Sequence, residues 1–395
     1  MTTNHSTPEK LRILIDAHAI GGEYQGSVSY LKGLYQAMIE KYSEHYDFYF
    51  AGYNYEAMRA CFPQVKAENF LLLYSPSRLM RLGIELPRLI RQHQIDFAHF
   101  QYIVPLVKPC KFIVTTHDLL FNDFPEEFSD WFRISRNVLF RKSLERSDIR
   151  LTVSNYSRQA ICRHYGLLPE TIHLTPNAVN TKFFEPYDKV SAMMKVWQKY
   201  ELSNYLLYVS RVEPRKNQQL LLQAYEELRL ANKGIQLVFV GNNTYGQDEL
   251  AKAIAQLDGA SARHVRWMKQ VSDEDLLLLC RGADLFVYPS KAEGFGIPPL
   301  EAAAAGIPTL CSNATAMEDY DFFDPYRFDP EDRKALKQCL SQVLRQGPAG
   351  ETLESIALRI KTTYSWEHSA EVLHRQICRT QELGKVPQPS KAFES

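Results

Sequence analysis

Short apolar runs alternate with longer amphipathic stretches along the whole chain. In the first half, runs rich in β-branched and aromatic residues, bounded by polar or glycine-containing turns, indicate strands at 11–18, 46–53, 95–101, 111–118 and 149–155. Helical patterns separate them, and the first predicts a helix from about Ser27 to Tyr42. This alternation of strand and helix favours a parallel, doubly wound α/β sheet.

The pattern loosens over residues 181–204 and then begins again. It predicts strands at 204–210, 235–241, 264–269 and 284–290, and helices at 217–231, 274–283, 300–306 and 366–382. We therefore expect an N-terminal domain over 1–185, a C-terminal domain over 186–365, and a final segment, 366–395, made of a helix and a polar tail. Two such domains are expected to bind ligands in a cleft at the carboxyl ends of their strands.

Composition supports this plan and excludes several classes of protein. A chain of 395 residues, 45% hydrophobic and 23% charged, is typical of a globular protein with two domains. Its zero net charge gives no general attraction to nucleic acid. Seven scattered cysteines without CxxC spacing indicate neither a zinc knuckle nor a disulfide framework. Without a signal peptide or an apolar run of about 20 residues, we expect a cytoplasmic protein.

The segment EGFGIPPLEAAAAG, residues 293–306, carries the sharpest chemical signal and follows a predicted strand. Pro298 and Pro299 suit the start of a helix, so Glu301 is expected in its first turn. Glu293 lies in the glycine-rich loop before that helix, where free backbone N–H groups attract anions. Both carboxylates can then accept hydrogen bonds from the hydroxyls of a sugar or a ribose. The alternative is a helix-dipole role for Glu301 beside ordinary turn glycines.

The second motif, SRVEPRKN, is basic and follows the strand predicted at 204–210. Its proline-containing turn can aim the cations Arg211 and Lys216 at one point, with Arg215 as a rival for the lysine's role. Fixed cations in a water-poor site stabilise the charge of a departing diphosphate. A solvated basic turn is the alternative.

Two features of the first domain are weaker signals. The glycine-rich loop 21–27 is placed to bind phosphate, although it lacks GxGxxG spacing. His117 stands at the carboxyl end of a predicted strand, where it would project toward the cleft. A lone histidine is more often structural than catalytic.

Taken together, these motifs resemble glycosyltransferase family 4, the retaining nucleotide-sugar transferases of GT-B fold, among them bacterial polysaccharide and lipopolysaccharide mannosyltransferases. Glu293 and Glu301 match the family's Glu-x7-Glu signature, which implies contacts to the donor sugar and to the ribose hydroxyls. Arg211 and Lys216 match its Arg…Lys pair, which implies that they hold the diphosphate.

The resemblance extends to the first domain and to the nucleobase pocket. Gly26, or alternatively Gly22, is expected to offer its N–H to the donor phosphate, although the stretch 27–29 departs from the family pattern. His117 is expected near the reacting sugar, and the helix of 366–395 is expected to cross back to the first domain. The full expected donor site is Gly22, Gly26, Arg211, Lys216, Met268, Lys269, Glu293, Gly294, Phe295, Gly296, Ile297 and Glu301. Catalysis is expected from His117, Arg211, Lys216 and Glu293.

No metal is expected to take part, and no cofactor beyond the donor co-substrate. The sequence offers no DxD motif directly after a strand and no cluster with metal-ligand spacing; residues 319–321 match DxD only as letters, in an acidic turn. The acceptor's hydroxyl would attack on the face that the leaving group departs from, which the resemblance implies gives retention at the anomeric carbon.

The acceptor is less well specified. Two basic, helix-like stretches, 77–92 and 131–150, also carry large apolar residues and could rest on the anionic inner face of the cytoplasmic membrane. An ordinary packed helix with a solvated basic face explains them equally well. A membrane contact would indicate a lipid-linked saccharide acceptor in cell-surface polysaccharide assembly, with mannose on guanosine diphosphate as the first donor to consider.

Two other functions stay open: a nucleotide-sugar epimerase of the same fold, and a non-catalytic nucleotide-sugar-binding subunit. A nicotinamide oxidoreductase would need GxGxxG spacing, which the first loop does not supply.

Overall fold

A computed structural model describes residues 9–22, 26–243 and 249–383 of the chain. The chain forms two compact units: unit 1 comprises residues 1–177 and 366–395, and unit 2 comprises residues 178–365. The division therefore lies at 177, whereas the sequence placed it near 185. The chain passes from one unit to the other twice, at these two points.

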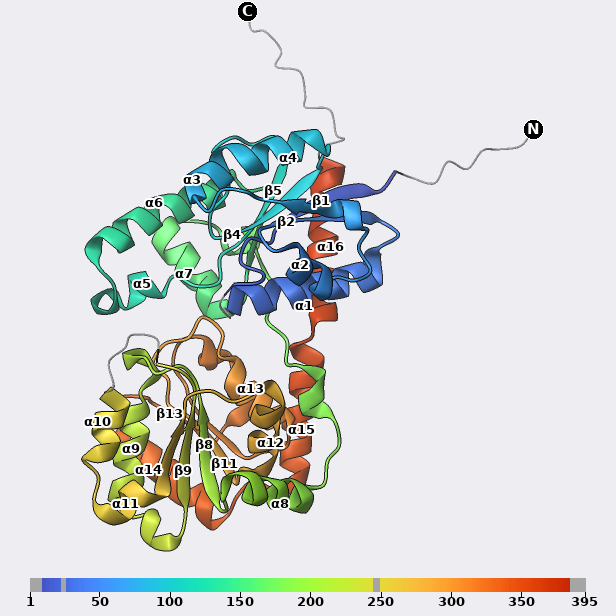
Figure 1. The fold of residues 1–395 in the computed structure, drawn as a ribbon. Coiled ribbons are helices and arrows are strands. Elements are labelled where there is room, and N and C mark those ends of the chain that lie inside the picture. Colours follow the sequence, from blue (N-terminus) through green and yellow to red (C-terminus); the bar gives the residue numbers. More distant parts are fainter. Residues whose placement is uncertain (1–8, 23–25, 244–248, 384–395) are drawn as a thin grey trace, which may run out of the picture. The chain divides into compact units, whose positions relative to one another are not determined.

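Unit 1 is built on a parallel sheet of seven strands, in the order β3-β2-β1-β4-β5-β6-β7. The strands are β1 (Leu11–Asp16), β2 (Tyr46–Gly52), β3 (Phe70–Leu72), β4 (Phe97–Gln101), β5 (Lys111–Thr115), β6 (Ile149–Thr152) and β7 (Ile172–Leu174). The helices are α1 (Gly26–Tyr42), α2 (Tyr55–Cys61), α3 (Arg78–Met80), α4 (Leu86–Gln92), α5 (Leu120–Asp123), α6 (Asp130–Arg146), α7 (Asn155–Tyr165) and α16 (Trp366–Leu383). A π-helical segment, η2 (Arg81–Glu85), joins α3 to α4 (Figure 1).

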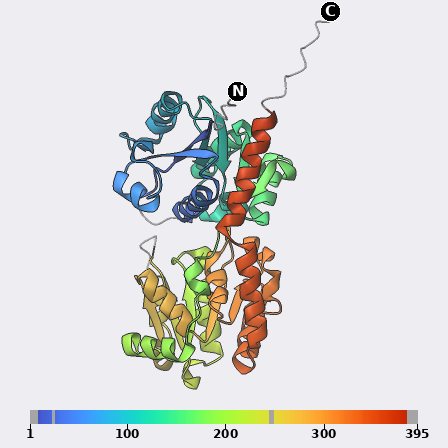
Figure 2. The same ribbon diagram turned by 90° about the vertical axis from the view of Figure 1, so that its right-hand side faces the viewer.

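The C-terminal helix α16 packs along α1, and two views show the helices side by side (Figure 1, Figure 2). The Trp366 ring fills the space that Gly33 leaves, because a Cβ on Gly33 would lie 2.0 Å from the ring. Near the other end of α1, Tyr42 stacks on His374 with 4.0 Å between the ring centroids. Residues almost 330 positions apart, such as Tyr46 and His374, thus share a hydrogen bond within unit 1.

Unit 2 repeats the design with a six-stranded parallel sheet, in the order β10-β9-β8-β11-β12-β13. Its strands are β8 (Tyr205–Val209), β9 (Gln236–Val240), β10 (Val265–Met268), β11 (Leu285–Tyr288), β12 (Thr309–Ser312) and β13 (Arg327–Phe328). Its helices are α8 (Lys189–Tyr200), α9 (Gln218–Glu227), α10 (Glu249–Ala255), α11 (Gly259–His264), α12 (Asp273–Gly282), α13 (Ile297–Ala304), α14 (Arg333–Arg345) and α15 (Gly350–Thr363). Figure 1 shows α9, α10 and α14 on one side of this sheet, and α8, α12 and α15 on the other.

Both units are therefore parallel and doubly wound, as the alternation of patterns predicted. Four strands, β3, β7, β12 and β13, were not predicted; β3, β7 and β13 have only two or three residues, too few to show a period of two. The stretch 131–150 is not one helix: α6 ends at Arg146, and Arg150 lies in β6. In the part of the chain that the structure describes, no helix is long and apolar enough to span a bilayer.

Candidate functional site

The centre of unit 2's candidate site is a buried ion pair between Lys216 and Glu293. The Lys216 Nζ lies 2.5 Å from Glu293 Oε1, and the two residues are only 8% and 6% exposed. They follow β8 and β11, which are neighbours in the sheet. Because the strands are parallel, their carboxyl ends meet at one edge, so residues 77 positions apart come into contact.

Hydrogen bonds between the two loops hold this pair in place. After β8 the chain makes a 3₁₀ turn, Pro214–Lys216, and Asn217 closes it in the left-handed region with φ 59°. The Asn217 side chain donates to the carbonyls of Pro289 and Pro330. The backbone N–H of Lys291 donates to the Arg215 carbonyl at 2.8 Å. The turn after β8 is therefore fixed to the loop after β11.

The Glu293 carboxylate is unevenly satisfied. Its Oε1 accepts from Lys216, from the Tyr288 hydroxyl at 2.7 Å and from the Ser290 hydroxyl at 2.8 Å. Among the described residues, its Oε2 has one long contact, to Arg215 Nη1 at 3.5 Å. A carboxylate oxygen can accept about two hydrogen bonds, so Oε2 has capacity left for a ligand hydroxyl.

The charge state of Glu293 follows from its neighbours. Burial alone would raise the pKa of this carboxyl group, but the charges of Lys216 and Arg215 outweigh it and lower the pKa to about 2. Burial lowers the pKa of Lys216, and Glu293 opposes that shift. Glu293 is therefore an anion at neutral pH, and the positive charges of Lys216 and Arg215 stabilise this ionised form.

The three candidate cations occupy different places. Arg215 pairs with Glu213 at 2.7 Å and donates to the Ala292 carbonyl at 2.7 Å, so it links the turn after β8 to the loop after β11. Arg211 is exposed, and its backbone carbonyl accepts a hydrogen bond from the Gln218 side chain. Of the predicted pair, only Lys216 lies within the buried cluster, and Arg215 is the second cation that reaches Glu293.

The loop Gly294–Gly296 turns the chain from β11 into α13. Gly296 precedes the helix with φ 87°, a conformation that favours glycine, and a Cβ there would lie 3.1 Å from the Met317 sulfur. Phe295 is buried, with its carbonyl held by the Tyr320 hydroxyl at 2.5 Å. The loop's conformation is thus set by packing beneath it.

Glu301 corrects one detail of the sequence interpretation. Since α13 begins at Ile297, Glu301 is its fifth residue and lies in the second turn instead of the first. The Glu301 carboxylate receives no hydrogen bond from the residues that the structure describes. Burial, reinforced by the nearby charge of Asp273, raises its pKa to about 7.

The expected nucleobase contacts lie at the end of β10. The carbonyl of Met268 accepts a hydrogen bond from the Gly241 N–H at 3.0 Å. The Lys269 ammonium lies 4.7 Å from the centroid of the Trp267 ring. In the following helix, α12, Ser272 is the N-cap, and its hydroxyl accepts a hydrogen bond from the Asp275 N–H.

In unit 1, the candidate phosphate loop is only partly described. Gly22 is exposed and hydrogen-bonds back to the Ala19 carbonyl, and Gly26 is the exposed first residue of α1. Residues 23–25 of the predicted loop lie outside the described residues. Residues 27–29 belong to α1, in agreement with the helix predicted from about Ser27 to Tyr42.

His117 is buried between two tyrosines in unit 1. Its ring lies 4.9 Å from that of Tyr30 and 5.3 Å from that of Tyr102, between centroids. Its Nε2 is 2.5 Å from the Gln101 side-chain oxygen, so with that amide orientation Nε2 carries the proton. Burial lowers the pKa of His117 to about 4, and the ring is neutral at pH 7.

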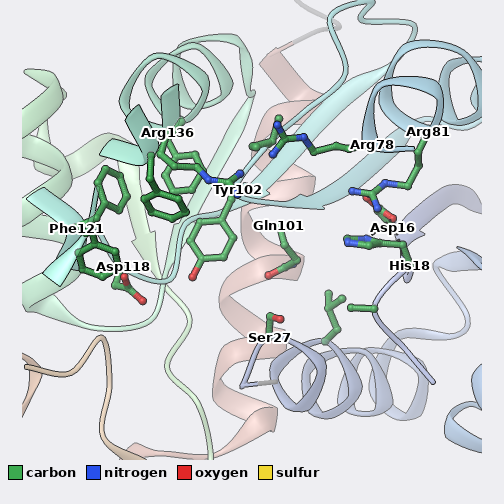
Figure 3. Close-up of a pocket in the computed structure, with 16 residues that line it drawn as sticks. Asp16, His18, Ser27, Arg78, Arg81, Gln101, Tyr102, Asp118, Phe121 and Arg136 are labelled. Carbon is green, nitrogen blue, oxygen red and sulfur yellow. Dashed lines mark hydrogen bonds and ion pairs between the residues drawn. The ribbon is translucent and has the colours of Figure 1, made fainter. Parts of the chain in front are cut away.

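A pocket of about 410 Å³ in unit 1 was not predicted from the sequence. It opens between α1, the α3–η2 segment and α6, beside the end of β4 (Figure 3). Its polar lining comprises Asp16, His18, Ser27, Arg78, Arg81, Gln101, Asp118 and Arg136, and aromatic and aliphatic residues line the rest. The arginines lie within or close to the basic stretches recognised in the sequence, but their convergence depends on the fold.

No group of three or more His, Cys, Asp or Glu side chains that could hold a metal ion occurs in residues 9–22, 26–243 and 249–383. The acidic segment 319–321 contains Tyr320, which is buried, and Asp321, which pairs with Arg359 at 2.7 Å.

Two family models match the chain, one in each half. The model described as "Glycosyltransferase Family 4" matches residues 24–183, and the model described as "Glycosyl transferases group 1" matches residues 190–358. The matched ranges correspond closely to the two units.

Several curated relatives are mannosyltransferases by name. The O-antigen chain mannosyltransferase B of Escherichia coli is 32% identical over 260 residues, which are 65% of this chain and 67% of the relative. The serotype-specific mannosyltransferase WbdA of Escherichia coli is 26% identical over 230 residues, 58% of this chain but only 28% of that longer protein. A GDP-mannose-dependent alpha-(1-6)-phosphatidylinositol monomannoside mannosyltransferase of Mycobacterium tuberculosis is 28% identical over 63% of this chain and 67% of its own length.

A solved structure has the same fold over nearly the whole chain. The glycosyltransferase from Rickettsia africae superimposes with a TM-score of 0.71, covering 96% of this chain and 100% of the other, at 17% identity. At this identity the likeness concerns the fold alone, and it confirms the predicted fold class.

The buried pair yields a first prediction. Lys216→Met should lower the free energy of unfolding by about 3–5 kcal/mol, because it leaves the Glu293 carboxylate buried without its ammonium partner. Adding Glu293→Gln should restore part of that loss, giving a favourable coupling above about 1 kcal/mol in a double-mutant cycle. Urea unfolding of the full chain measures both.

The matched control is Lys199→Met, since Lys199 also forms a 2.6 Å ion pair, with Asp275, but is 53% exposed. An exposed pair contributes about 0–1 kcal/mol. Equal losses for the two lysine variants would show that the Lys216 pair is not the energetic centre of unit 2.

Glu301 yields a pH-dependent prediction. Its pKa is raised from 4.5 to about 7, so the stability that its protonated form provides is present below about pH 4.5 and lost as the pH rises through 7. Glu301→Gln should therefore stabilise the protein by about 1–3 kcal/mol at pH 8, and by less than about 1 kcal/mol at pH 5. Thermal unfolding at the two pH values tests this, and a variant no more stable than the natural chain at pH 8 would contradict it.

Proposed function

The chain belongs to the glycosyltransferases described by the group 1 and Family 4 models. From that premise we propose that it transfers a hexose from a nucleoside-diphosphate sugar to a saccharide or lipid-linked saccharide acceptor. Mannose is the first hexose to consider. The names of the curated relatives support mannose and guanosine diphosphate as the donor's parts. They also support a place in the assembly of cell-surface polysaccharide.

One observation carries this proposal: a buried, anionic Glu293 held against Lys216 where two neighbouring strands end. A structural ion pair needs no spare acceptor, yet Glu293 Oε2 keeps hydrogen-bonding capacity. Glu301, in the second turn of α13, is a second carboxylate without a hydrogen-bond donor among the described residues. Glu293, paired with Lys216, and Glu301, in the helix that follows, suit a ligand that brings hydroxyls and a diphosphate.

In the proposed reaction, the Lys216 ammonium shifts from pairing with Glu293 alone to pairing also with the diphosphate. Its positive charge then stabilises the negative charge that develops there as the bond to the sugar breaks. The Arg211 and Arg215 guanidinium groups add positive charge at the same edge of the sheet, so the leaving group needs no metal. Glu293 accepts a hydrogen bond from the transferred sugar, and Glu301 accepts from the ribose. The acceptor hydroxyl attacks on the face that the leaving group vacates and gives its proton to an oxygen of the departing diphosphate, with retention at the anomeric carbon.

His117 has a narrower proposed role. Burial keeps its ring neutral at pH 7, and Gln101 orients it through Nε2. Such a ring can hydrogen-bond a sugar hydroxyl without exchanging a proton in the reaction. We therefore treat His117 as a sugar contact, and not as the general base.

A membrane contact by unit 1 is the finer part of the proposal. Large apolar side chains are exposed along the α3–η2 segment (Leu79, Met80 and Ile84) and along α6 (Trp131, Ile134 and Val138), with Leu79 82% exposed and Trp131 80% exposed. The same segments carry Arg78, Arg133, Arg141 and Lys142. Exposed apolar residues among cations suit the interface of an anionic bilayer better than they suit water.

The activity test is the release of nucleoside diphosphate from a panel of nucleotide sugars, with and without saccharide and lipid-linked acceptors, in the presence of a chelator. We expect release from GDP-mannose that increases with acceptor. Lys216→Met should lower kcat by about 10²–10³-fold, as for loss of one fixed transition-state charge, whereas Lys199→Met should not. Glu301→Gln should mainly weaken donor binding.

Three other outcomes would redirect the proposal. Donor binding with no release under any condition would favour the non-catalytic binding subunit. Conversion of the nucleotide sugar to its epimer without transfer would favour the epimerase. Loss of activity on chelation, restored by a divalent cation, would refute metal independence.

The membrane test compares matched variants on vesicles containing phosphatidylglycerol. Leu79→Ser with Trp131→Ser should weaken sedimentation with the vesicles about tenfold or more, because each side chain loses roughly 1.5–3 kcal/mol of apolar burial. The control is Leu358→Ser with Trp197→Ser, which removes the same exposed residue types from unit 2. Equal binding by the two double variants would argue against a membrane contact through α3 and α6.

A further inference from the structure

The pocket of unit 1 contains more positive charge than its own side chains neutralise. Arg78 of α3 and Arg136 of α6 have no hydrogen bond or ion pair from the residues that the structure describes, although Arg136 lies over the Phe132 ring at 5.0 Å. Their guanidinium groups point toward the same part of the pocket, near Tyr102 (Figure 3). Burial lowers the pKa of Arg136, and the charge of Arg78 lowers it further, as expected of close like charges.

A third arginine is buried in the pocket wall with a donor unsatisfied. Arg81 is 8% exposed, and among the described residues its Nε has no partner within hydrogen-bond distance. Its one ion pair among those residues is a 3.6 Å contact from this Nε to Asp16, a carboxylate that also pairs with His18 at 2.9 Å. Buried polar groups are normally hydrogen-bonded, and Asp16 satisfies this guanidinium only at long range, so Arg81 can still donate to a bound anion.

The remaining lining limits what that acceptor can be. Asp118 is the other carboxylate of the pocket, and it lies beside Phe121, away from Arg78 and Arg81 in Figure 3. Tyr102 stacks on Phe140 at 4.9 Å, and its own backbone is left-handed, with φ 63°. A left-handed tyrosine is strained, and such strain is common at ligand sites. The pocket thus joins a cationic side to an aromatic wall.

We propose that this pocket binds a phosphate group of the acceptor, held by Arg78 and Arg136 with Arg81 behind them. Calling it the acceptor's phosphate depends on the proposed function; the anion site itself does not. A phosphate offers oxygens in several directions and up to two charges, which suits guanidinium groups arriving from different helices. A single carboxylate group, by contrast, can form a two-hydrogen-bond pair with only one guanidinium group.

The position of the arginines indicates that the phosphate joins a saccharide to a lipid. Arg78 and Arg136 lie on the same segments whose apolar side chains, such as Leu79 and Trp131, are exposed. A molecule with a lipid chain, a phosphate and a sugar would thus meet an apolar rim, a cationic side and an aromatic wall in that order.

The test uses octyl phosphate below its micelle concentration as the probe, with octyl glucoside as its uncharged counterpart. Titration calorimetry on the full chain should show tighter binding of octyl phosphate. Arg78→Gln with Arg136→Gln should weaken it about tenfold or more, as loss of charge-assisted hydrogen bonds implies. The control, Arg88→Gln with Lys142→Gln, removes two exposed cations from α4 and α6 outside the pocket and should leave the affinity unchanged.

Three results separate the possible sources of the phosphate. Equal losses in the two double variants would overturn the proposal, because they indicate diffuse attraction and not a site. GDP that competes with octyl phosphate, or binds the pocket variant more weakly, would also overturn it by assigning the pocket to the donor. The two double variants could bind phosphatidylglycerol vesicles equally weakly while only the pocket variant loses affinity for octyl phosphate. That result supports a phosphate site distinct from the surface that binds lipid headgroups.

This test can fail independently of the proposed function. Release of nucleoside diphosphate from GDP-mannose in the absence of acceptor does not require an acceptor phosphate in the pocket, so the pocket variant should retain it. If the pocket variant retains release of nucleoside diphosphate and binds octyl phosphate as tightly as the natural chain, only the pocket proposal is refuted.

Discussion

The ion pair between Lys216 and Glu293 is the interaction on which the account of unit 2 depends. Two opposite charges, each less than a tenth exposed, are stable there only because the turn after β8 and the loop after β11 are tied together. Removing either charge would leave the other buried and uncompensated. The parallel order of β8 and β11 brings the residues together, and the loop Gly294–Gly296 carries the chain from Glu293 into α13.

A pair of this kind is also a means of holding reactive groups ready. Its charges are already desolvated, so a ligand that supplies its own anion and hydroxyls exchanges one set of partners for another without drawing bare charges out of water. Glu293 has an oxygen with spare capacity, and Glu301 is a carboxyl group that burial keeps close to half-protonated at neutral pH. Unit 1 offers a different chemistry: a neutral, oriented His117 and a pocket with three arginines.

The sequence predicted the fold class well because most strands and helices are long enough to show their periods, and it predicted Glu293 and Lys216 because motifs after strands fall at one sheet edge. It left Arg215 open as a rival of Lys216, since a turn's hydrogen bonds decide which side chain turns inward. It placed Glu301 one turn too early because the helix begins at Ile297. The pocket of unit 1 could not be predicted, because Arg78, Arg81 and Arg136 converge only through the packing of separate helices.

The most direct test of the central claim is a crystal structure of the chain with GDP-mannose or a non-transferable analogue. The account predicts that Lys216 Nζ lies within hydrogen-bond distance of a diphosphate oxygen, and that a sugar hydroxyl donates to Glu293 Oε2. The Lys216–Glu293 distance, 2.5 Å without ligand, should lengthen accordingly. A nucleotide sugar bound elsewhere, with this pair unchanged and untouched, would contradict the account.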